Sequence, residues 1–478
     1  MARASGVLMH ISSLYGDYSI GSFGDNAKEF IDFLKECDFS YWQVLPFCMA
    51  DSFNSPYQSY SAFAGNPYFV DLKTLYQKGV ITEGQLKSSC QNTPYSCEYD
   101  RLYEERLPLL LEASKKCSYK DEVKKFIDEN TEISSFCMFM AKKEANGHVQ
   151  WQKWDNDEIN PEILFMWQFI QYEFFTQWAE IKDYTNKKGI KIIGDMPIYV
   201  SLDSADVWSN QKLFCLDSEG RPLKVAGVPP DYFCADGQLW GNPLYNWEEM
   251  KKDGYSWWGR RISAMAKMFD GIRIDHFRGI EAYWSVDGNE TTARNGRWEK
   301  GPGMELINVI KENAGNCMII AEDLGDITEE VNALVRESGF PGMRVFQFGF
   351  LDGSDSTNMP HNYPKNCIAY TGTHDNNTLL GYLWELEAGR KKDMLNYCGF
   401  FGDNFEEGFD YVLRTLWRSH ADTVILPIQD LLGYGSDTRL NTPGRAEGNW
   451  QFRITKEQLQ NIDKNKFREF NRIYKRKP

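Results

Sequence analysis

Short, nearly continuous apolar runs recur along the chain and predict buried β-strands. They are rich in the β-branched and aromatic residues that strands favour. Because they lack strict apolar–polar alternation, they are typical of parallel strands that helices cover on both faces. The eight runs span residues 6–12, 41–47, 191–200, 271–277, 318–325, 343–350, 367–375 and 423–433.

Amphipathic segments between these runs predict helices. The segment 25–38 places its large apolar side chains on one helical face, namely Phe30, Phe33, Leu34 and Cys37. The same kind of pattern, ending in a glycine stop, recurs at 160–189, 303–315 and 329–339. Strands that alternate with helices in this way predict a parallel α/β fold, and eight strands predict a closed (β/α)₈ TIM barrel.

Two connections between the predicted strands are far longer than ordinary loops. Residues 48–190 are predicted to form an inserted, mostly helical subdomain. Residues 201–256, rich in Asp, Gly, Pro and Trp, are predicted to form an inserted lid region at the active-site rim. We expect a single catalytic barrel over 1–478, because no Gly/Ser-rich or Pro-rich linker divides the chain, and no separate C-terminal β-sandwich after residue 433.

Composition narrows the class of ligand. The chain of 478 residues has a net charge of −15, which disfavours nucleic acids and anionic membranes as partners. Aromatic residues make up 15% of the chain. A large core would explain them, and so would a sugar-binding surface, because a pyranose offers an apolar face that stacks on aromatic rings. Composition alone leaves both explanations open.

The eleven cysteines are odd in number and include no CxxC pair, so we expect reduced, mostly buried thiols. No HExxH motif or paired Cys/His spacing predicts a metal site. The first residues hold too short an apolar run for a signal peptide, and no run reaches the about 18 apolar residues of a membrane span. The expected location is therefore cytoplasmic.

Carboxylates lie at the ends of four predicted strands, as Asp195, Asp275, Glu322 with Asp323, and Asp375. In a barrel these strand ends meet at one face. Each carboxylate alone could belong to a structural salt bridge, but several held together raise one another's pKa and cost stability. A retaining glycosidase uses that effect, with one carboxylate as nucleophile and a protonated carboxyl as acid, roughly 5–5.5 Å apart.

Arg273 precedes Asp275 by two residues, so in a strand both side chains point to the same face. An arginine in that place would keep a nucleophilic carboxylate ionised.

Six segments carry a resemblance to a known family. "GIRIDHFRG", "AEDLG" and "TGTHDNNT" resemble three motifs of the α-amylase superfamily. With "GDMPIYV", "SPYQSYSAFAGNPYFVDL" and "PPDYFCADGQLWGNPLYNW", the chain resembles the 4-α-glucanotransferases, also called amylomaltases or disproportionating enzymes. The resemblance extends from "GVLMHISSL" to "NTPGRAEGNW", nearly the whole chain.

The resemblance implies roles for the three carboxylates. Asp275 would be the nucleophile that forms a β-glucosyl-enzyme, and Glu322 the general acid and then the base. Asp375 would bind sugar hydroxyls and stabilise the transition state.

The resemblance also implies a set of sugar-binding residues. Those at the cleavage point are Arg273, Asp195, His374, Tyr57 and Ser55. "DYFCADGQLWGNP" resembles a mobile loop over the site, in which Phe233 and Trp240 would contact the glucan; packing within the loop is the alternative for both. His276, which follows the proposed nucleophile, receives no firm role.

These features together predict a retaining 4-α-glucanotransferase that passes α-1,4-glucan segments between malto-oligosaccharides, with no cofactor and no metal. Two alternatives remain: an α-amylase-type hydrolase with the same carboxylates, and a glucan-binding protein without activity. The intact set of Asp275, Glu322 and Asp375 disfavours the second. Oligomeric state stays open.

Overall fold

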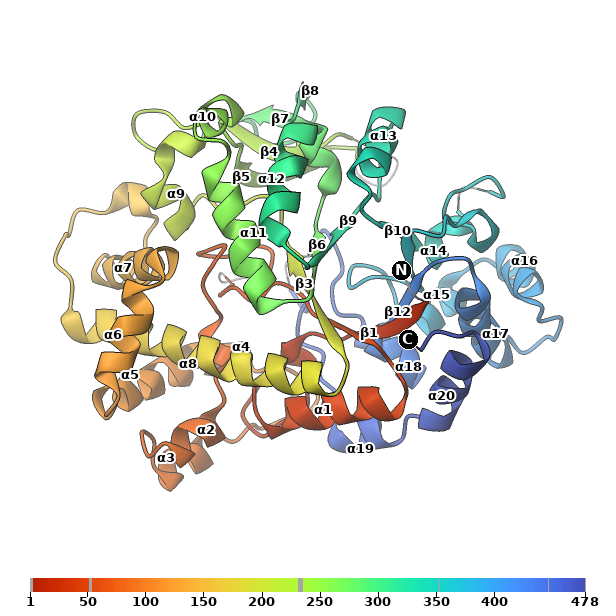
Figure 1. Ribbon diagram of the computed structural model, residues 1–478, viewed down its shortest axis with the longest axis horizontal. Helices are drawn as coiled ribbons and strands as arrows, with labels where there is room; N and C mark the ends of the chain where they lie inside the picture. Colours follow the sequence, from red (N-terminus) through yellow and green to blue (C-terminus); the bar gives the residue numbers. More distant parts are fainter. Residues whose placement is uncertain (1–2, 51–53, 231–234, 352, 446, 478) are drawn as a thin grey trace.

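Eight parallel strands close into a barrel in the computed structural model of the protein (Figure 1). The structure describes residues 3–50, 54–230, 235–351, 353–445 and 447–477. The barrel strands, each overlapping one predicted run, are β1 (Ala4–Leu8), β2 (Tyr41–Gln43), β3 (Lys191–Met196), β6 (Gly271–Ile274), β9 (Met318–Ala321), β10 (Gly342–Val345), β11 (Cys367–Tyr370) and β12 (Thr423–Pro427). The predicted TIM barrel is confirmed.

The barrel closes where β1 pairs with both β2 and β12. Gly6 lies opposite Tyr41 of β2, and a Cβ at this position would come within 2.6 Å of the Tyr41 Cβ. The absence of a side chain at Gly6 therefore permits the close approach of the two strands.

Helices pack around the outside of the barrel, and four of them match the predicted ones: α1 (Asp25–Glu36), α8 (Pro161–Lys187), α12 (Met304–Ala314) and α13 (Glu329–Ser338). Local signals set their ends. The Asn160 side chain accepts a hydrogen bond from the Glu162 N–H at the start of α8, where Pro161 takes the first helical position. Gly339 ends α13 in the left-handed conformation, with a φ of 70°.

The connection from β2 to β3 is helical. It contains α2 (Leu72–Gln77), α3 (Glu83–Ser88), α4 (Tyr99–Arg101), α5 (Leu107–Lys115), α6 (Lys120–Asp128), α7 (Thr131–Ala145) and then α8. Figure 1 shows these helices, in orange and yellow, gathered to one side of the barrel.

A second, antiparallel sheet was not predicted from the sequence. Its strands, in the order β5-β4-β7-β8, are β4 (Lys224–Val228), β5 (Gln238–Pro243), β7 (Ala282–Asp287) and β8 (Arg297–Lys300). These strands carry polar residues, as in "RWEK" of β8, and lack the long apolar runs that revealed the barrel strands. Part of the segment predicted as a lid loop is therefore strand β5.

The remaining helices follow the later strands. They are α9 (Ala205–Ser209), α10 (Trp247–Lys252), α11 (Ser256–Met268), α14 (Phe346–Gly349), α15 (Leu379–Glu385), α16 (Ala388–Cys398), α17 (Phe405–Arg418), α18 (Ile428–Leu432), α19 (Lys456–Gln460) and α20 (Lys464–Ile473). After residue 433, the described residues form α19, α20 and a short 3₁₀ turn but no β-sandwich.

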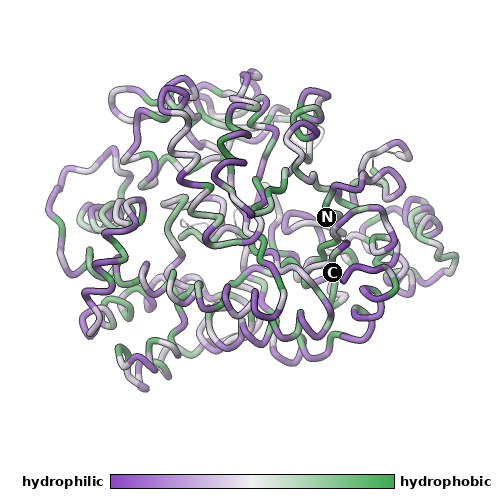
Figure 2. The backbone as a smooth tube through the Cα atoms, in the orientation of Figure 1, coloured by the Kyte–Doolittle hydropathy of each residue, from purple (hydrophilic) through white to green (hydrophobic). Residues whose placement is uncertain are grey.

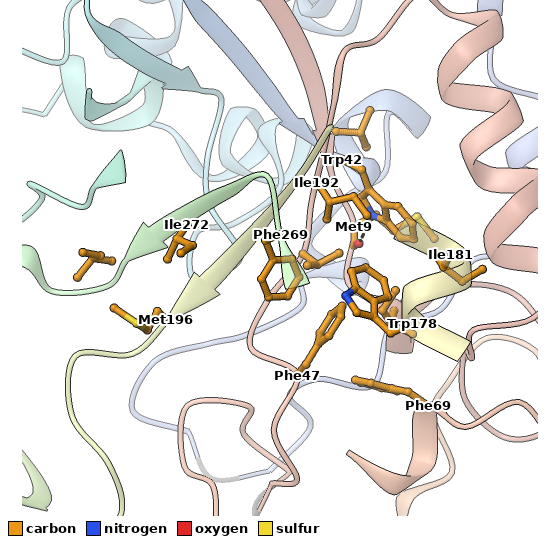
Figure 3. Packing of buried hydrophobic residues seen from close by; sticks show 14 of the residues in the cluster. Met9, Trp42, Phe47, Phe69, Trp178, Ile181, Ile192, Met196, Phe269 and Ile272 are labelled. Atoms are coloured by element: carbon orange, nitrogen blue, oxygen red, sulfur yellow. Dashed lines mark hydrogen bonds between the residues drawn. The ribbon is translucent and has the colours of Figure 1, made fainter. Parts of the chain in front are cut away.

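An aromatic cluster joins the barrel to α8 (Figure 3). The Trp178 ring of α8 meets Phe47 edge to face at 4.6 Å between centroids, and Phe269 lies 5.2 Å from Phe47. The Trp178 indole N–H donates to the Met268 carbonyl at 3.1 Å, so its buried polar atom is satisfied.

Hydrophilic segments lie mainly toward the outside of the fold (Figure 2). In Figure 2 the purple, hydrophilic segments lie mainly on the outer loops and helix faces.

Six of the ten described cysteines are buried and all ten are free thiols, whereas Cys234 lies outside the described residues. Among the described residues, no helix has the length and apolar character needed to cross a membrane.

Candidate active site

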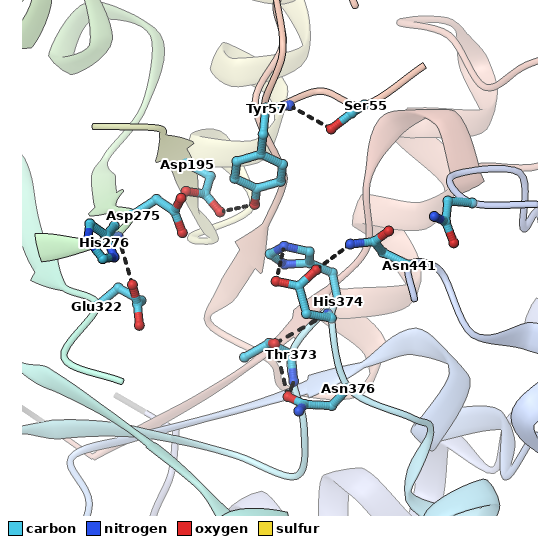
Figure 4. A network of polar contacts seen from close by, with 12 residues as sticks. Ser55, Tyr57, Asp195, Asp275, His276, Glu322, Thr373, His374, Asn376 and Asn441 are labelled. Carbon is cyan, nitrogen blue, oxygen red and sulfur yellow. Dashed lines mark hydrogen bonds and ion pairs between the residues drawn. The ribbon is translucent and has the colours of Figure 1, made fainter. Parts of the chain in front are cut away.

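Four strands bring carboxylates to the C-terminal end of the barrel. Asp195 is the penultimate residue of β3, Asp275 and Glu322 directly follow β6 and β9, and Asp375 follows β11 within the next loop. Figure 4 shows Asp195, Asp275 and Glu322 on one side, His374 and Asn441 on the other, and Tyr57 between the two groups. The residues come from distant parts of the sequence, and the closed barrel brings the four carboxylates together at one end.

Arg273 joins two of these carboxylates. Its Nη1 lies 2.8 Å from both oxygens of Asp195, and its Nη2 lies 2.8 Å from Asp275 Oδ1. Burial acts to lower the pKa of Arg273, but the charges of Asp195 and Asp275 outweigh it and raise that pKa well above its usual value. The guanidinium is therefore a permanent positive charge beside Asp275.

Asp195 is fully buried, with 0% of its side chain exposed. The Tyr57 hydroxyl donates to its Oδ2 at 2.8 Å. Burial raises the pKa of Asp195, while Arg273 acts in the opposite direction. Asp275, by contrast, keeps 29% of its side chain exposed and so remains open to a ligand.

Glu322 accepts two backbone hydrogen bonds that fix its carboxyl group. The His276 N–H donates to Oε2 at 2.7 Å, and the Leu324 N–H donates to Oε1 at 2.9 Å. Burial first, and the charge of Asp275 next, raise the pKa of Glu322 to about 7; Arg273 and the two N–H groups oppose that rise. This carboxyl group can therefore carry a proton near neutral pH.

The dipeptide Asp275–His276 positions two carboxylates at once. The Asp275 N–H donates to the Met196 carbonyl at 2.9 Å, in continuation of the β6 ladder. The chain then turns at His276, whose φ of 52° is unusual for a residue with a side chain, and this turn directs the His276 N–H at Glu322. Burial lowers the pKa of His276 to about 4, so its ring is neutral.

Asp375 is held on both of its oxygens. The His374 Nε2 lies 3.2 Å from Oδ2, and the Asn441 amide donates to Oδ1 at 2.6 Å. Burial acts to raise the pKa of Asp375, but His374 and Asn441 outweigh it and lower that pKa to about 2. Asp375 is therefore ionised, and 44% of its side chain remains exposed.

Aromatic rings surround His374. The Tyr57 ring stacks on the imidazole at 5.1 Å with an interplanar angle of 15°, and Trp450 lies 5.8 Å from the same imidazole. Ser55 supports this arrangement, since its Oγ accepts from the Tyr57 N–H at 3.3 Å.

Two members of the set were missed by sequence reasoning. Asn441 and Trp450 lie in the segment after the last strand, where no strand end marks them as part of the site. The signal that could have found them is the polar and aromatic stretch "NTPGRAEGNW", which begins with Asn441 and closes the family resemblance.

Trp240 approaches the site from strand β5 of the small sheet. Its ring meets His276 at 4.8 Å in a perpendicular arrangement, and its N–H donates to the Gln238 side chain at 3.2 Å. Phe233, the other predicted aromatic contact, lies outside the described residues.

A cavity of about 520 Å³ lies next to Trp450. Its walls come from the loops that follow β1 and β2 and from the helical insertion. They include His10, Pro56, Tyr99 and Tyr103. Such a volume falls in the range of small-molecule sites.

Among the described residues, no group of three His, Cys, Asp or Glu side chains is arranged to hold a metal ion.

Comparison with known proteins gives a consistent result. Residues 9–459 match the family model described as 4-alpha-glucanotransferase. A 4-alpha-glucanotransferase of Clostridium butyricum is 45% identical over 98% of this chain and 100% of its own length. One from Thermus thermophilus is 42% identical, covering 95% of each chain. The solved amylomaltase of Streptococcus agalactiae, in complex with acarbose, superposes with a TM-score of 0.95 at 42% identity, over 99% of each chain.

Proposed function

This chain belongs to the 4-alpha-glucanotransferase family and is a glycosyl-transferring enzyme, and we propose that it works by a retaining mechanism through a covalent intermediate on Asp275. The proposed substrates are malto-oligosaccharides and other α-1,4-glucans. The observation that carries the mechanism is the contrast between two neighbouring carboxyl groups: Arg273 contacts Asp275, whereas burial raises the pKa of Glu322 to about 7.

In the first step, Asp275 attacks the anomeric carbon of the donor sugar, and Glu322 gives its proton to the glycosidic oxygen. The C1–O bond breaks, a β-glucosyl ester forms on Asp275, and the reducing-end fragment leaves with a new 4-hydroxyl group. Because Arg273 holds Oδ1 of Asp275, we assign the attack to Oδ2.

In the second step, the 4-hydroxyl of an acceptor glucan attacks the same carbon from the opposite side. The Glu322 carboxylate takes the hydroxyl proton, the ester bond to Asp275 breaks, and an α-1,4 bond forms with retained configuration. Both steps use the same two residues, so the sequence of events restores the enzyme without a further reactant.

The other site residues would hold the sugar at the cleavage point. Asp375 is ionised and its side chain is partly exposed, so it can accept hydrogen bonds from two sugar hydroxyls. The neighbouring His374 can donate one hydrogen bond to the sugar. Asp195 lies on the opposite side, and Tyr57 lies between the two groups (Figure 4), where its ring can offer a face to the pyranose. Ser55 would act through Tyr57.

Transfer rather than hydrolysis requires an acceptor site that outcompetes water. Trp240, beside His276, supplies an aromatic surface at the edge of the proposed site, and Phe233 is proposed as its companion. We further propose that 1–478 forms one catalytic barrel, with 48–190 as a helical subdomain and 201–256 as the lid region. A lid that binds the acceptor glucan would also exclude water.

Incubation with maltotriose tests the reaction type. Transfer yields glucose and longer chains while total reducing ends stay constant; a steady rise in reducing ends would instead establish the α-amylase-type hydrolase. Asp275→Asn is expected to lower the rate by at least about 10⁴-fold, because no ester can form on the amide.

A 5-fluoro-glucosyl fluoride would trap the intermediate in the wild-type protein. Peptide mapping should then find the added sugar on the peptide that contains Asp275. A label on another carboxylate would remove Asp275 as the nucleophile, and binding of glucans without any turnover would favour the glucan-binding protein.

A further inference from the structure

The loop that carries His374 and Asp375 is tied to a buried carboxylate on another strand. Asp430 lies in the short helix α18, directly after barrel strand β12, and is 1% exposed. It is not among the residues of the proposed site.

Asp430 contacts the two ends of that loop. Its Oδ2 accepts a hydrogen bond from the Thr371 hydroxyl, and its Oδ1 accepts one from the Leu379 N–H at 2.7 Å. Thr371 directly follows β11, and Leu379 is the first residue of α15. Residues 372–378, which include His374 and Asp375, therefore run between two points fixed on a single carboxylate.

Other residues also hold this loop. The Gln347 amide donates to the Asn377 carbonyl at 2.8 Å, and the Asn377 amide donates to the Ser436 hydroxyl at 2.9 Å. Both act on Asn377, near the α15 end, and the Gln347 N–H also donates to the Thr371 carbonyl at 3.4 Å. Asn441 holds Asp375 and the His374 carbonyl, and Arg439 donates to the Asp375 carbonyl. Asp430 differs from these residues because its one carboxylate joins the Thr371 side chain to the first residue of α15.

The buried position of Asp430 is unfavourable for a charged carboxylate. Burial raises its pKa to about 6, against the opposing effect of the Thr371 and Leu379 hydrogen bonds. Within the described part of the chain, no Lys, Arg or His side chain forms an ion pair with it. A buried carboxyl group without a cation destabilises a fold unless its hydrogen bonds compensate. Here both hydrogen bonds serve the same loop.

We propose that Asp430 is a positioning residue for the transfer reaction: its two hydrogen bonds hold Thr371 and Leu379 and thereby position His374 and Asp375 at the donor sugar. We call this pair of hydrogen bonds the clasp. The inference rests on the proposed function, since it takes the role of Asp375 from there. Asp430 itself does not touch the substrate; it acts through the loop.

Three variants test the clasp in the full-length protein. Asp430→Ala removes both hydrogen bonds and should lower kcat for maltotriose transfer about 100-fold, the scale expected for a misplacement of about 1 Å. KM should change by less than about threefold, because the lost interaction matters most in the transition state. Asp430→Asn can accept from Leu379 and donate to the Thr371 oxygen, so it should restore kcat to within about threefold of wild type.

Thr371→Val removes one hydrogen bond without changing the side-chain shape, and we expect about a tenfold loss in kcat. It keeps the proposal testable if Asp430→Ala does not fold. Where both fold, the double variant should lose little more than Asp430→Ala alone, because the two residues act as one unit. Independent losses that multiply would overturn the clasp.

Asp270→Ala is the matched control. Its Oδ2 accepts from the Ile192 N–H at 2.8 Å and from the Asn186 amide at 2.9 Å, at the opposite end of the barrel. It also removes two side-chain hydrogen bonds of an aspartate, and it should lower the melting temperature while kcat stays unchanged. Equal effects of Asp270→Ala and Asp430→Ala on kcat would show a general loss of stability and overturn the inference.

Asp375→Asn, measured in the same assay, separates this inference from the proposed function. If Asp375→Asn lowers kcat and Asp430→Ala does not, the clasp is wrong and the proposed role of Asp375 stands. If Asp430→Ala lowers kcat and Asp375→Asn does not, the proposed role of Asp375 is wrong, and with it the claim that Asp430 acts through that residue.

Discussion

In the proposed mechanism Glu322 needs a proton at the start of each catalytic cycle, and its surroundings decide the pH range in which it has one. Its pKa is raised to about 7, so the carboxyl is protonated below that pH and loses its proton as the pH rises through it. The proposed acid form therefore disappears on the alkaline side. We expect kcat/KM to fall about tenfold per pH unit above about pH 7.

The pH dependence is measured with maltotriose from about pH 5 to 9. A fall that begins near the usual pKa of a glutamate would contradict the role of burial at Glu322. Glu322→Gln provides the control: it should lose activity on maltotriose but regain the first step with α-maltosyl fluoride, because fluoride leaves without protonation.

Tyr57 combines two interactions that substitution can separate. Its hydroxyl donates to Asp195, and its ring stacks on His374. Tyr57→Phe removes the hydroxyl alone and should cost about 1 kcal/mol of transition-state stabilisation, a roughly fivefold loss in kcat/KM. Tyr57→Ala also removes the stacking surface and should cost several times more. Steady-state kinetics with maltotriose compares the two; equal losses would mean that the ring contributes nothing.

Among the elements, the barrel strands and the carboxylates at their ends could be predicted because both have strong local signals. A buried parallel strand is mostly apolar, and a carboxylate at its end, such as Asp275 or Glu322, stands out against it. The small sheet could not be found in this way, since its strands do not lie in long apolar runs. Asn441 and Asp430 act on a loop that only the closed barrel brings to them.

Strand β5 of the small sheet gives Trp240 a fixed place beside His276. Trp240→Ala should weaken acceptor binding more than it slows the first chemical step. Within the described residues, Trp240 forms no hydrogen bond with Asp275 or Glu322. We expect KM for maltotriose to rise and the ratio of hydrolysis to transfer to increase, as water competes better for the intermediate.

Reducing-end release relative to longer products measures that ratio. Leu223→Ala, an exposed substitution next to β4 in the same region, is the control and should leave the ratio unchanged. An unaltered ratio in Trp240→Ala would indicate that this tryptophan only packs against its neighbours.

At the scale of the whole molecule, the helical insertion and the barrel share one core. Helix α8 packs against α5, α6 and α7 of the insertion and also against α1, α11 and β3 of the barrel. Leu110 of α5 and Trp178 of α8 belong to the same continuous cluster of buried residues. A subdomain defined by its position in the sequence is thus not separated from the barrel by a boundary in the packing.

This shared core predicts cooperative unfolding. Trp178→Ala removes a large side chain between α8 and the barrel and should lower the free energy of unfolding by about 3–5 kcal/mol. Leu110→Ala, a buried change within the insertion, should lower it by about 2–5 kcal/mol. If the insertion and barrel unfold together, calorimetry should give one transition for each variant, shifted to lower temperature as a whole. The contrary result would be two transitions in Leu110→Ala alone: one at low temperature, at which transfer activity is also lost, and a second at the original temperature. That result would show that residues 48–190 unfold as a separate unit.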